Sequence, residues 1–179
     1  MGLVIVALLS GVYVWSTYNR LVGMNEGINS QWAQVETQYQ RRFDLIPNLV
    51  QSVKGSMAQE QKIFGEIAEA RTRYSGAANI NQKAEAATQL ENAFGRLLVI
   101  MENYPELKSS NNVQTLMAQL EGTENRISVE RKRYNDSVNQ FNAAIKKVPA
   151  NLIASQLGFS ERSYFKAETG SEKAPKVEL

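Results

Sequence analysis

The sequence predicts an all-α protein, with an N-terminal transmembrane helix followed by an antiparallel up-down four-helix bundle of long helices. The first 19 residues carry no charged side chain. Beyond them apolar residues recur at helical spacing, and no stretch alternates apolar and polar residues as a half-buried strand does. The predicted organisation is an anchor at 1–18, a bundle at 19–148, a docking segment at 149–169 and a mobile tail at 170–179.

Composition narrows the chemistry that this chain can perform. Its 179 residues suffice for one domain with a sizeable core, and the net charge of +2 is spread along the chain, so no nucleic-acid partner is expected. The sequence contains neither cysteine nor histidine. Their absence excludes disulfides, thiolate and imidazole metal ligands, and Ser–His or Cys–His catalytic pairs. We expect a non-enzymatic protein without a cofactor.

The N-terminal segment is the predicted transmembrane helix. Gly2–Tyr18 reads GLVIVALLSGVYVWSTY, and these 17 residues reach roughly 25 Å as a helix, enough for a bilayer core of about 30 Å with local adjustment. Tyr13, Trp15 and Tyr18 fit the aromatic belt of a membrane interface. A cleaved signal peptide is the alternative, although the segment lacks a charged n-region and an A-x-A-like cleavage site.

Two features bear on the orientation and assembly of this anchor. Arg20 is the only basic residue close to the span, so the positive-inside rule gives a weak lean toward a cytoplasmic body and leaves the side undetermined. Ala7 and Gly11 form a small-x-x-x-small spacing, which permits close contact between helices in a bilayer. We expect these two residues to take part in self-association.

The stretch Gln40–Gly55, QRRFDLIPNLVQSVKG, is predicted to form a corner between two helices. Arg41 and Arg42 suit a helix C-terminus, Asp44 suits the N-terminus of the next helix, and Pro47 then falls in its first turn. We expect the chain to reverse direction within this motif. The alternative is a kink at the proline inside one continuous helix.

Four apolar stripes define the helices of the predicted bundle. The first repeats every eleven residues, which suits a nearly straight helix, and the fourth recurs at strict sevens and ends before Pro149. A loop at 75–81 and the pair Tyr104-Pro105 separate the later stripes. In chain order the stripes are Leu21, Met24, Ile28, Trp32, Val35, Tyr39, Phe43 and Ile46; Val50, Val53, Met57, Phe64, Ile67 and Tyr74; Ala87, Leu90, Phe94, Leu97, Leu98 and Met101; and Val113, Leu120, Ile127, Tyr134, Phe141 and Val148.

After the bundle, the segment 149–169 is expected to dock on it through Leu157, Phe159, Tyr164 and Phe165.

Charged residues also fall on the apolar stripes. These are Glu60, Arg71, Glu124 and Arg131. Full burial of an isolated charge is costly, so we expect them to point inward and to pair across helices, which would fix the helix register. An ion site with oxygen ligands and an outward facing of these positions are the alternatives.

Several pieces of the sequence are similar to one known family. QRRFDLIPNLVQSVKG, directly after an N-terminal span and YNRLV, resembles the signature of the LemA family of bacterial membrane-anchored proteins. Further similar pieces are WAQVETQYQRR, AR at 70–71, RLL at 96–98, ENYPELK at 102–108, ENRISVERKRYN at 124–135, GFSERSYF at 158–165 and the final APKVEL. Their order and spacing make the resemblance specific over nearly the whole chain. It departs at the start, MGLV, where members often carry lysines, and at Val113, which is more often aromatic in the family.

The resemblance implies an anchor in the bacterial inner membrane, an antiparallel helical bundle and no established catalytic activity. It also implies links to membrane organisation and to homo-oligomeric assembly. We therefore expect a non-enzymatic, single-pass protein that acts through protein contacts, with the lipid bilayer, a second copy of the chain and other membrane proteins as partners. A membrane-remodelling or lipid-binding assembly is the alternative, followed by an ion-binding bundle.

Overall fold

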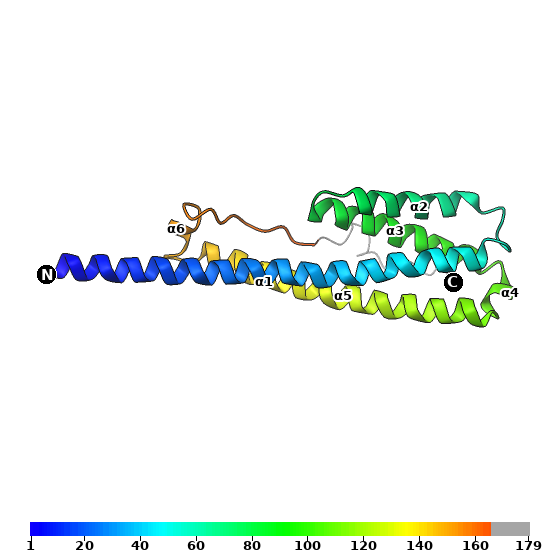
Figure 1. The fold of residues 1–179 in the computed structure, drawn as a ribbon, viewed down its shortest axis with the longest axis horizontal. Coiled ribbons are helices and arrows are strands. Elements are labelled where there is room, and N and C mark those ends of the chain that lie inside the picture. Colours follow the sequence, from blue (N-terminus) through cyan, green and yellow to red (C-terminus); the bar gives the residue numbers. More distant parts are fainter. Residues whose placement is uncertain (166–179) are drawn as a thin grey trace, which may run out of the picture. The chain divides into compact units, whose positions relative to one another are not determined.

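The computed structural model describes residues 1–165, among which it places helices and no strand (Figure 1). The side chain of Lys108 is also outside the description. The helices are α1 (Gly2–Val53), α2 (Gln61–Gly76), α3 (Ile80–Met101), α4 (Pro105–Lys108), α5 (Asn111–Lys146) and α6 (Asn151–Ala154). The predicted all-α class with a long, apolar N-terminal helix is confirmed. Residues 166–169 of the predicted docking segment, and the tail predicted at 170–179, lie outside the described residues.

The chain divides into two compact units, and α1 and α5 contribute to both. Unit 1 comprises Met1–Thr37 and Ser128–Tyr164. Unit 2 comprises Gln38–Ile127 and, among the described residues, also Phe165. Each unit has its own set of buried apolar side chains.

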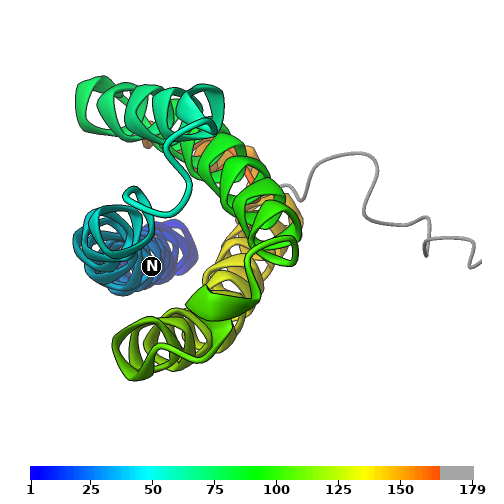
Figure 2. The same cartoon turned by 90° about the vertical axis from the view of Figure 1, so that its right-hand side faces the viewer.

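In unit 2, parts of α1, α2, α3 and α5 supply the buried side chains, and Figure 2 shows these helices close to end-on. The helices α2 and α3 pack on each other across a short loop. Asn79 caps α3, because its side chain accepts a hydrogen bond from the backbone N–H of Gln82 at 2.9 Å. The Gln82 side chain in turn accepts from the backbone N–H of Ala78 at 2.9 Å, so two backbone donors at this helix start have side-chain partners.

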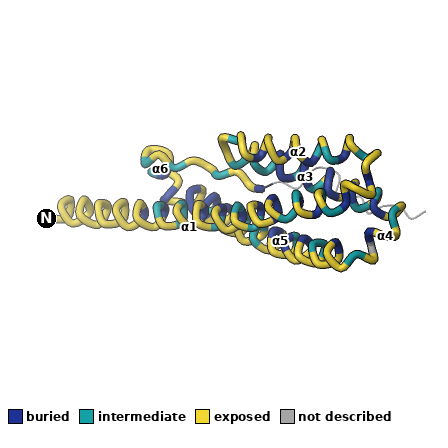
Figure 3. The backbone as a smooth tube through the Cα atoms, turned by 45° about the vertical axis from the view of Figure 1, so that its right-hand side comes forward, coloured by how far each residue is buried: buried dark blue, intermediate teal, exposed yellow. Residues whose placement is uncertain are grey.

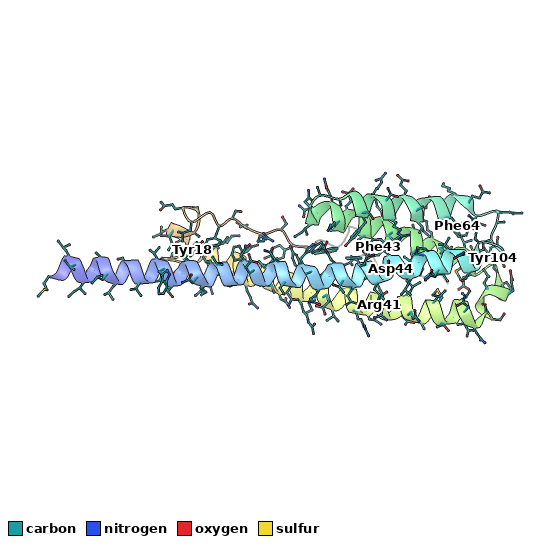
Figure 4. The ribbon with its side chains drawn as sticks, in the orientation of Figure 1. Tyr18, Arg41, Phe43, Asp44, Phe64 and Tyr104 are labelled. Atoms are coloured by element: carbon teal, nitrogen blue, oxygen red, sulfur yellow. The ribbon has the colours of Figure 1, made fainter. Side chains whose placement is uncertain are left out.

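The corner predicted at Arg41, Arg42, Asp44 and Pro47 is wrong. All four residues lie inside α1, and Figure 4 shows Arg41 and Asp44 on uninterrupted helix. The chain turns instead at 54–60, between the end of α1 and the start of α2. The continuous helix that was the alternative reading is therefore the one observed.

Burial explains why α1 continues past its proline. Leu49 and Val53, which follow Pro47, are both 0% exposed, and full burial of one such side chain contributes about 1.5–3 kcal/mol. Pro47 in a helix interior costs about 3 kcal/mol, which the burial of these two residues offsets. Met57, also fully buried, then closes the core beneath the turn.

Unit 1 is built on the pairing of α1 with the second part of α5. Figure 3 shows a run of buried residues along α1 beyond its exposed N-terminal part. Its core includes an edge-on contact between Trp32 and Tyr134, whose ring centroids lie 5.6 Å apart. Val148 does not extend the fourth stripe, because α5 ends at Lys146 and leaves Val148 78% exposed.

The segment that follows α5 packs on unit 1 by rings and hydrogen bonds. Phe159 lies 5.9 Å from Tyr18 and 6.1 Å from Phe141, measured between ring centroids. The buried side chain of Asn142 makes two hydrogen bonds to the backbone of Arg162. Its Nδ2 donates to the carbonyl oxygen and its Oδ1 accepts from the N–H, each at 2.9 Å. These bonds fix an otherwise irregular backbone to α5.

Candidate functional site

A groove of about 820 Å³ lies in unit 2, between α3 and α5. Its walls are mostly apolar, and Arg42 of α1 also lines it. Concave, largely apolar surfaces with a few polar groups are the usual form of binding sites. The lining residues are Arg42, Glu91, Phe94, Gly95, Leu98, Met101, Glu102, Val113, Gln114, Met117, Ala118, Leu120, Glu121 and Glu124.

Arg42 is the buried charge at the base of this groove, and its residue is only 4% exposed. Its Nη1 donates a hydrogen bond to Oε2 of Glu124 and lies 3.6 Å from Oε1 of Glu91. The guanidinium also lies over the ring of Phe94, 5.4 Å from the centroid, a cation–π arrangement. Tyr39 donates to the same Glu91 oxygen at 3.4 Å, which helps to hold that carboxylate in place. The cluster therefore places a desolvated cation where two carboxylates compensate it.

The groove carries an excess of negative charge. Among the described side chains that line it, there are four carboxylates, those of Glu91, Glu102, Glu121 and Glu124, and one guanidinium, that of Arg42. Arg42 Nε is buried and makes no hydrogen bond among the described residues. A group that binds here would meet apolar walls and an acidic rim.

The sequence-predicted interior charges are not a single cluster. Glu124 is half-buried and bonds to Arg42, a residue that had been assigned to the corner. Glu60 is half-buried directly before α2, and Arg131 is half-buried on the part of α5 that belongs to unit 1. Arg71 is exposed, so its predicted inward direction is wrong. Val50, Met57, Phe64 and Arg71 follow one another at seven-residue intervals, which would share a face only on one helix, and the turn at 54–60 interrupts that spacing.

Arg71 lies instead at the edge of a second, smaller cavity of unit 2. This cavity measures about 470 Å³ and lies between α1 and α2. Its lining includes Phe43, Pro47 and Phe64. Pro47 thus serves as an apolar wall of this cavity, not as the start of a helix.

The sequence analysis does not predict the two central residues of the site. It assigns Arg42 to a helix end instead of to a buried ion pair, and it does not name Glu91. A signal for Arg42 was present. It follows Tyr39 by three positions and precedes Ile46 by four, so an uninterrupted helix places all three on one face. Glu91 adjoins Leu90 of the third stripe, and that adjacency alone does not identify a partner for Arg42.

The second candidate site is the N-terminal part of α1. One helix is long and apolar enough to cross a membrane, by length and composition, and its apolar window lies near the N-terminus with 6% of the window buried. The leucines and valines here are exposed; Leu3 is 88% exposed and Leu9 66%. Ala7 and Gly11 are exposed as well, and a side chain added at Gly11 would meet open space.

Together these features define an all-helical protein with a candidate membrane helix at its N-terminus and an acidic, apolar groove in its body. Among residues 1–165, no three acidic side chains gather as metal ligands do. The sequence profile of the LemA family matches residues 31–179, and the chain belongs to this family.

The sequence is also similar to magnetosome proteins of two species. Magnetosome proteins MamQ 1 and MamQ 2 of Paramagnetospirillum magneticum are each 28% identical to this chain over an alignment of length 201, which covers 96% of this chain and 74% of the relative. Magnetosome protein MamQ of Magnetospirillum gryphiswaldense is 29% identical, over 83% of this chain and 64% of the relative. Family membership and the apolar N-terminal helix together point to a membrane-associated, non-catalytic protein.

Proposed function

We propose that this chain is a non-enzymatic, single-pass protein of the bacterial inner membrane that acts through protein contacts and assembles with itself. The exposed apolar surface at the start of α1 carries the proposal. Its side chains from Leu3 to Val14 face outward, and no described element covers them. A contiguous apolar surface of this length is stable in lipid and unfavourable in water. LemA membership and the absence of cysteine and histidine support a role without catalysis.

The body of the protein is part of the same proposal. Parts of four helices contribute buried apolar side chains to unit 2, which supports an up-down four-helix bundle there. Such a bundle covers a shorter range than the 19–148 expected from the sequence. Since Arg20 follows the span directly, the positive-inside rule favours a cytoplasmic body.

Labelling of a single introduced cysteine tests the membrane topology, because the chain contains no cysteine of its own. Lys132 is exposed on α5, and Lys132→Cys provides a reporter in the body. We expect a membrane-impermeant maleimide to label it after permeabilisation of spheroplasts and not before. Equal labelling of intact spheroplasts would place the body on the outer side and contradict the assigned orientation.

The groove between α3 and α5 is the surface we assign to protein contacts. Its apolar walls and its four carboxylates against one guanidinium favour a partner segment that is apolar and carries a lysine or arginine. Two or three buried contacts at the centre of such a groove typically dominate binding. Met117 and Leu98 line it and are half-buried, so they are accessible to a partner.

Site-specific photo-crosslinking in native membranes tests this surface. A photoreactive residue at Met117 should give an adduct whose cross-linked peptide contains a basic residue, whereas the same group at Val129, outside the groove, should not. Glu121→Lys should abolish the adduct, and Asp136→Lys, on the same helix outside the groove, should leave it. Equal adducts at both positions, or no effect of Glu121→Lys, would contradict the assignment.

Self-assembly is tested by light scattering of the full-length protein in detergent. We expect a particle larger than the monomer across a wide range of protein concentrations. Ala7→Leu combined with Gly11→Leu should dissociate it if close packing of the spans drives assembly, while Val12→Leu should not. A monomer at every concentration would refute self-assembly.

A lipid-binding or membrane-remodelling assembly is the second candidate function. One feature favours it, namely the exposed apolar side chains of Val148 and Leu152 in the same unit as the span. Deformation of liposomes by the full-length protein, compared with the protein lacking residues 1–16, would distinguish it from a protein-contact role.

A further inference from the structure

We propose that the connection between α5 and α6 is a second membrane contact, which rests on the surface of an anionic bilayer beside the transmembrane helix. The contact surface consists of Val148, Pro149 and Leu152, flanked by Lys146 and Lys147. This inference rests on the proposed function, because it requires residues 2–18 to cross the bilayer.

Packing inside unit 1 places this connection at the end of the apolar span. Phe159, shortly after α6, contacts the ring of Tyr18 at 5.9 Å. Thr17 is only 9% exposed, although its neighbours along the span are exposed. Figures 1 and 3 show α6 beside α1, and Figure 4 shows Tyr18 next to α6. The first charged residue after the span is Arg20, so this level of α1 is where lipid would give way to water.

The side chains presented at this level suit a membrane interface. Val148 is 78% exposed and Leu152 is 66% exposed, and Pro149 between them is also exposed. Single exposed apolar residues are ordinary on protein surfaces, but these residues belong to the same unit as the exposed apolar side chains of the span. The acyl–headgroup boundary would take up such side chains without a further fold element.

Charge at the same place favours an anionic surface. Lys146 is the last residue of α5, Lys147 follows it directly before Val148, and Arg20 lies on the part of α1 that belongs to the same unit. Lys146 bonds to Glu161 at 2.8 Å, the acid that faces this cluster. Among the described residues, these three basic groups face one acid, Glu161, which is ion-paired with Lys146, and the positive balance attracts anionic headgroups over a Debye length.

Depth measurements on the full-length protein in lipid nanodiscs test the contact. Single nitroxide-labelled cysteines at Val148 or Leu152 report on the proposed surface, Leu8 reports on the span, and Val129, an exposed valine of the same unit, reports on water. In discs containing phosphatidylglycerol, we expect the ratio of oxygen to nickel-chelate accessibility at 148 and 152 to exceed that at 129 severalfold, with the ratio at 8 higher still.

The outcomes separate this inference from the proposed function. A lipid-like ratio at 8 with water-like ratios at 148 and 152 would overturn the second contact and leave the anchor intact. Water-like ratios at all positions would overturn both. Low accessibility to both reagents at 152, with dipolar broadening between labels, would show that a second copy covers the surface and would also overturn the lipid contact.

A charge variant tests the preference for anionic lipid. Lys147→Glu should lower the accessibility ratio at 152 severalfold in phosphatidylglycerol discs and leave it unchanged in phosphatidylcholine discs. Lys132→Glu, an exposed lysine of α5 away from this surface, serves as the matched control and should have no effect in either lipid. An equal response of the two variants would refute the role of the basic cluster.

Discussion

The ion pair at the base of the groove predicts an asymmetric response to the loss of its acidic and basic members. The Arg42 side chain is 5% exposed, whereas those of Glu91 and Glu124 are 21% and 45% exposed. Glu91→Gln combined with Glu124→Gln would leave a buried guanidinium without the two carboxylates that contact it. Removing one side of a buried pair costs about 3–5 kcal/mol, and we expect the double variant to lose a free energy of unfolding in this range.

Arg42→Met should cost less, because it removes the buried charge itself and keeps an apolar stem of similar length. The carboxylates left behind remain partly hydrated, so solvent screening reduces the loss to about 1–2 kcal/mol. The triple variant, which combines Arg42→Met with both glutamines, removes every charge of the cluster. We expect it to be more stable than the double variant of the two acids.

Urea unfolding of the full-length protein in micelles, followed by helical circular dichroism, measures these differences. Glu69→Gln is the matched control, since it breaks an exposed pair with Arg73 at 2.7 Å and should cost only about 0–1 kcal/mol. If the double acid variant is no less stable than Arg42→Met, the guanidinium is not a buried charge and the reasoning about the groove fails.

Three other perturbations test unit 1. Removal of residues 1–16 should leave a helical, cooperatively melting protein, because these side chains are exposed and Thr17 is the first buried one; loss of the helical signal would contradict this. Asn142→Ala should cost about 1–3 kcal/mol and speed proteolysis at 155–165, because the backbone N–H and C=O of Arg162 lose their partners; unchanged cleavage would argue against this anchoring role. Burial raises the pKa of Tyr134 above 10.0, and Arg162 lowers it by less. The folded state therefore favours the neutral, protonated form of Tyr134. The contribution of this neutral phenol to the stability of the fold is complete below pH 10.0 and is lost as the pH rises through the folded pKa. Alkaline unfolding should therefore be less steep in pH for Tyr134→Phe than for the wild type, and equal slopes would refute the shift.

Helical periodicity gave the buried face of α1 correctly. Leu21, Ile28 and Val35 lie at 0% exposure on the eleven-residue repeat, and Met24 alone of that stripe is half-buried. The repeat succeeds because the packing of one helix face depends on residue spacing along the chain, which a single sequence contains. The fourth stripe behaves likewise from Val113 to Phe141.

The position of the turn was not predictable from the same information. Arg41, Arg42 and Asp44 satisfy the charge preferences of helix ends, but these preferences are worth less than about 1 kcal/mol each at exposed sites. Burial of the residues after Pro47 outweighs them. Gly55, in the actual turn, was the competing signal.

The groove could not be predicted from the sequence either, for a different reason. Its central contact joins Arg42 to Glu124, which are 82 positions apart, and to Glu91 on a third helix. Spacing along the chain places each residue on a face of its own helix and does not say which faces meet. Because the turn is predicted at the wrong place, the side of α2 on which Arg71 lies is also predicted incorrectly.

Membrane extraction tests the central claim, that the start of α1 is a lipid-embedded anchor for a helical body, most directly. The full-length protein and the protein lacking residues 1–16 are expressed in the same bacterium, and their membranes are washed with alkaline carbonate. We expect the full-length protein to stay in the bilayer pellet, because its exposed apolar span is embedded there, and the truncated protein to be released. Release of the full-length protein, or retention of the truncated one, would contradict it.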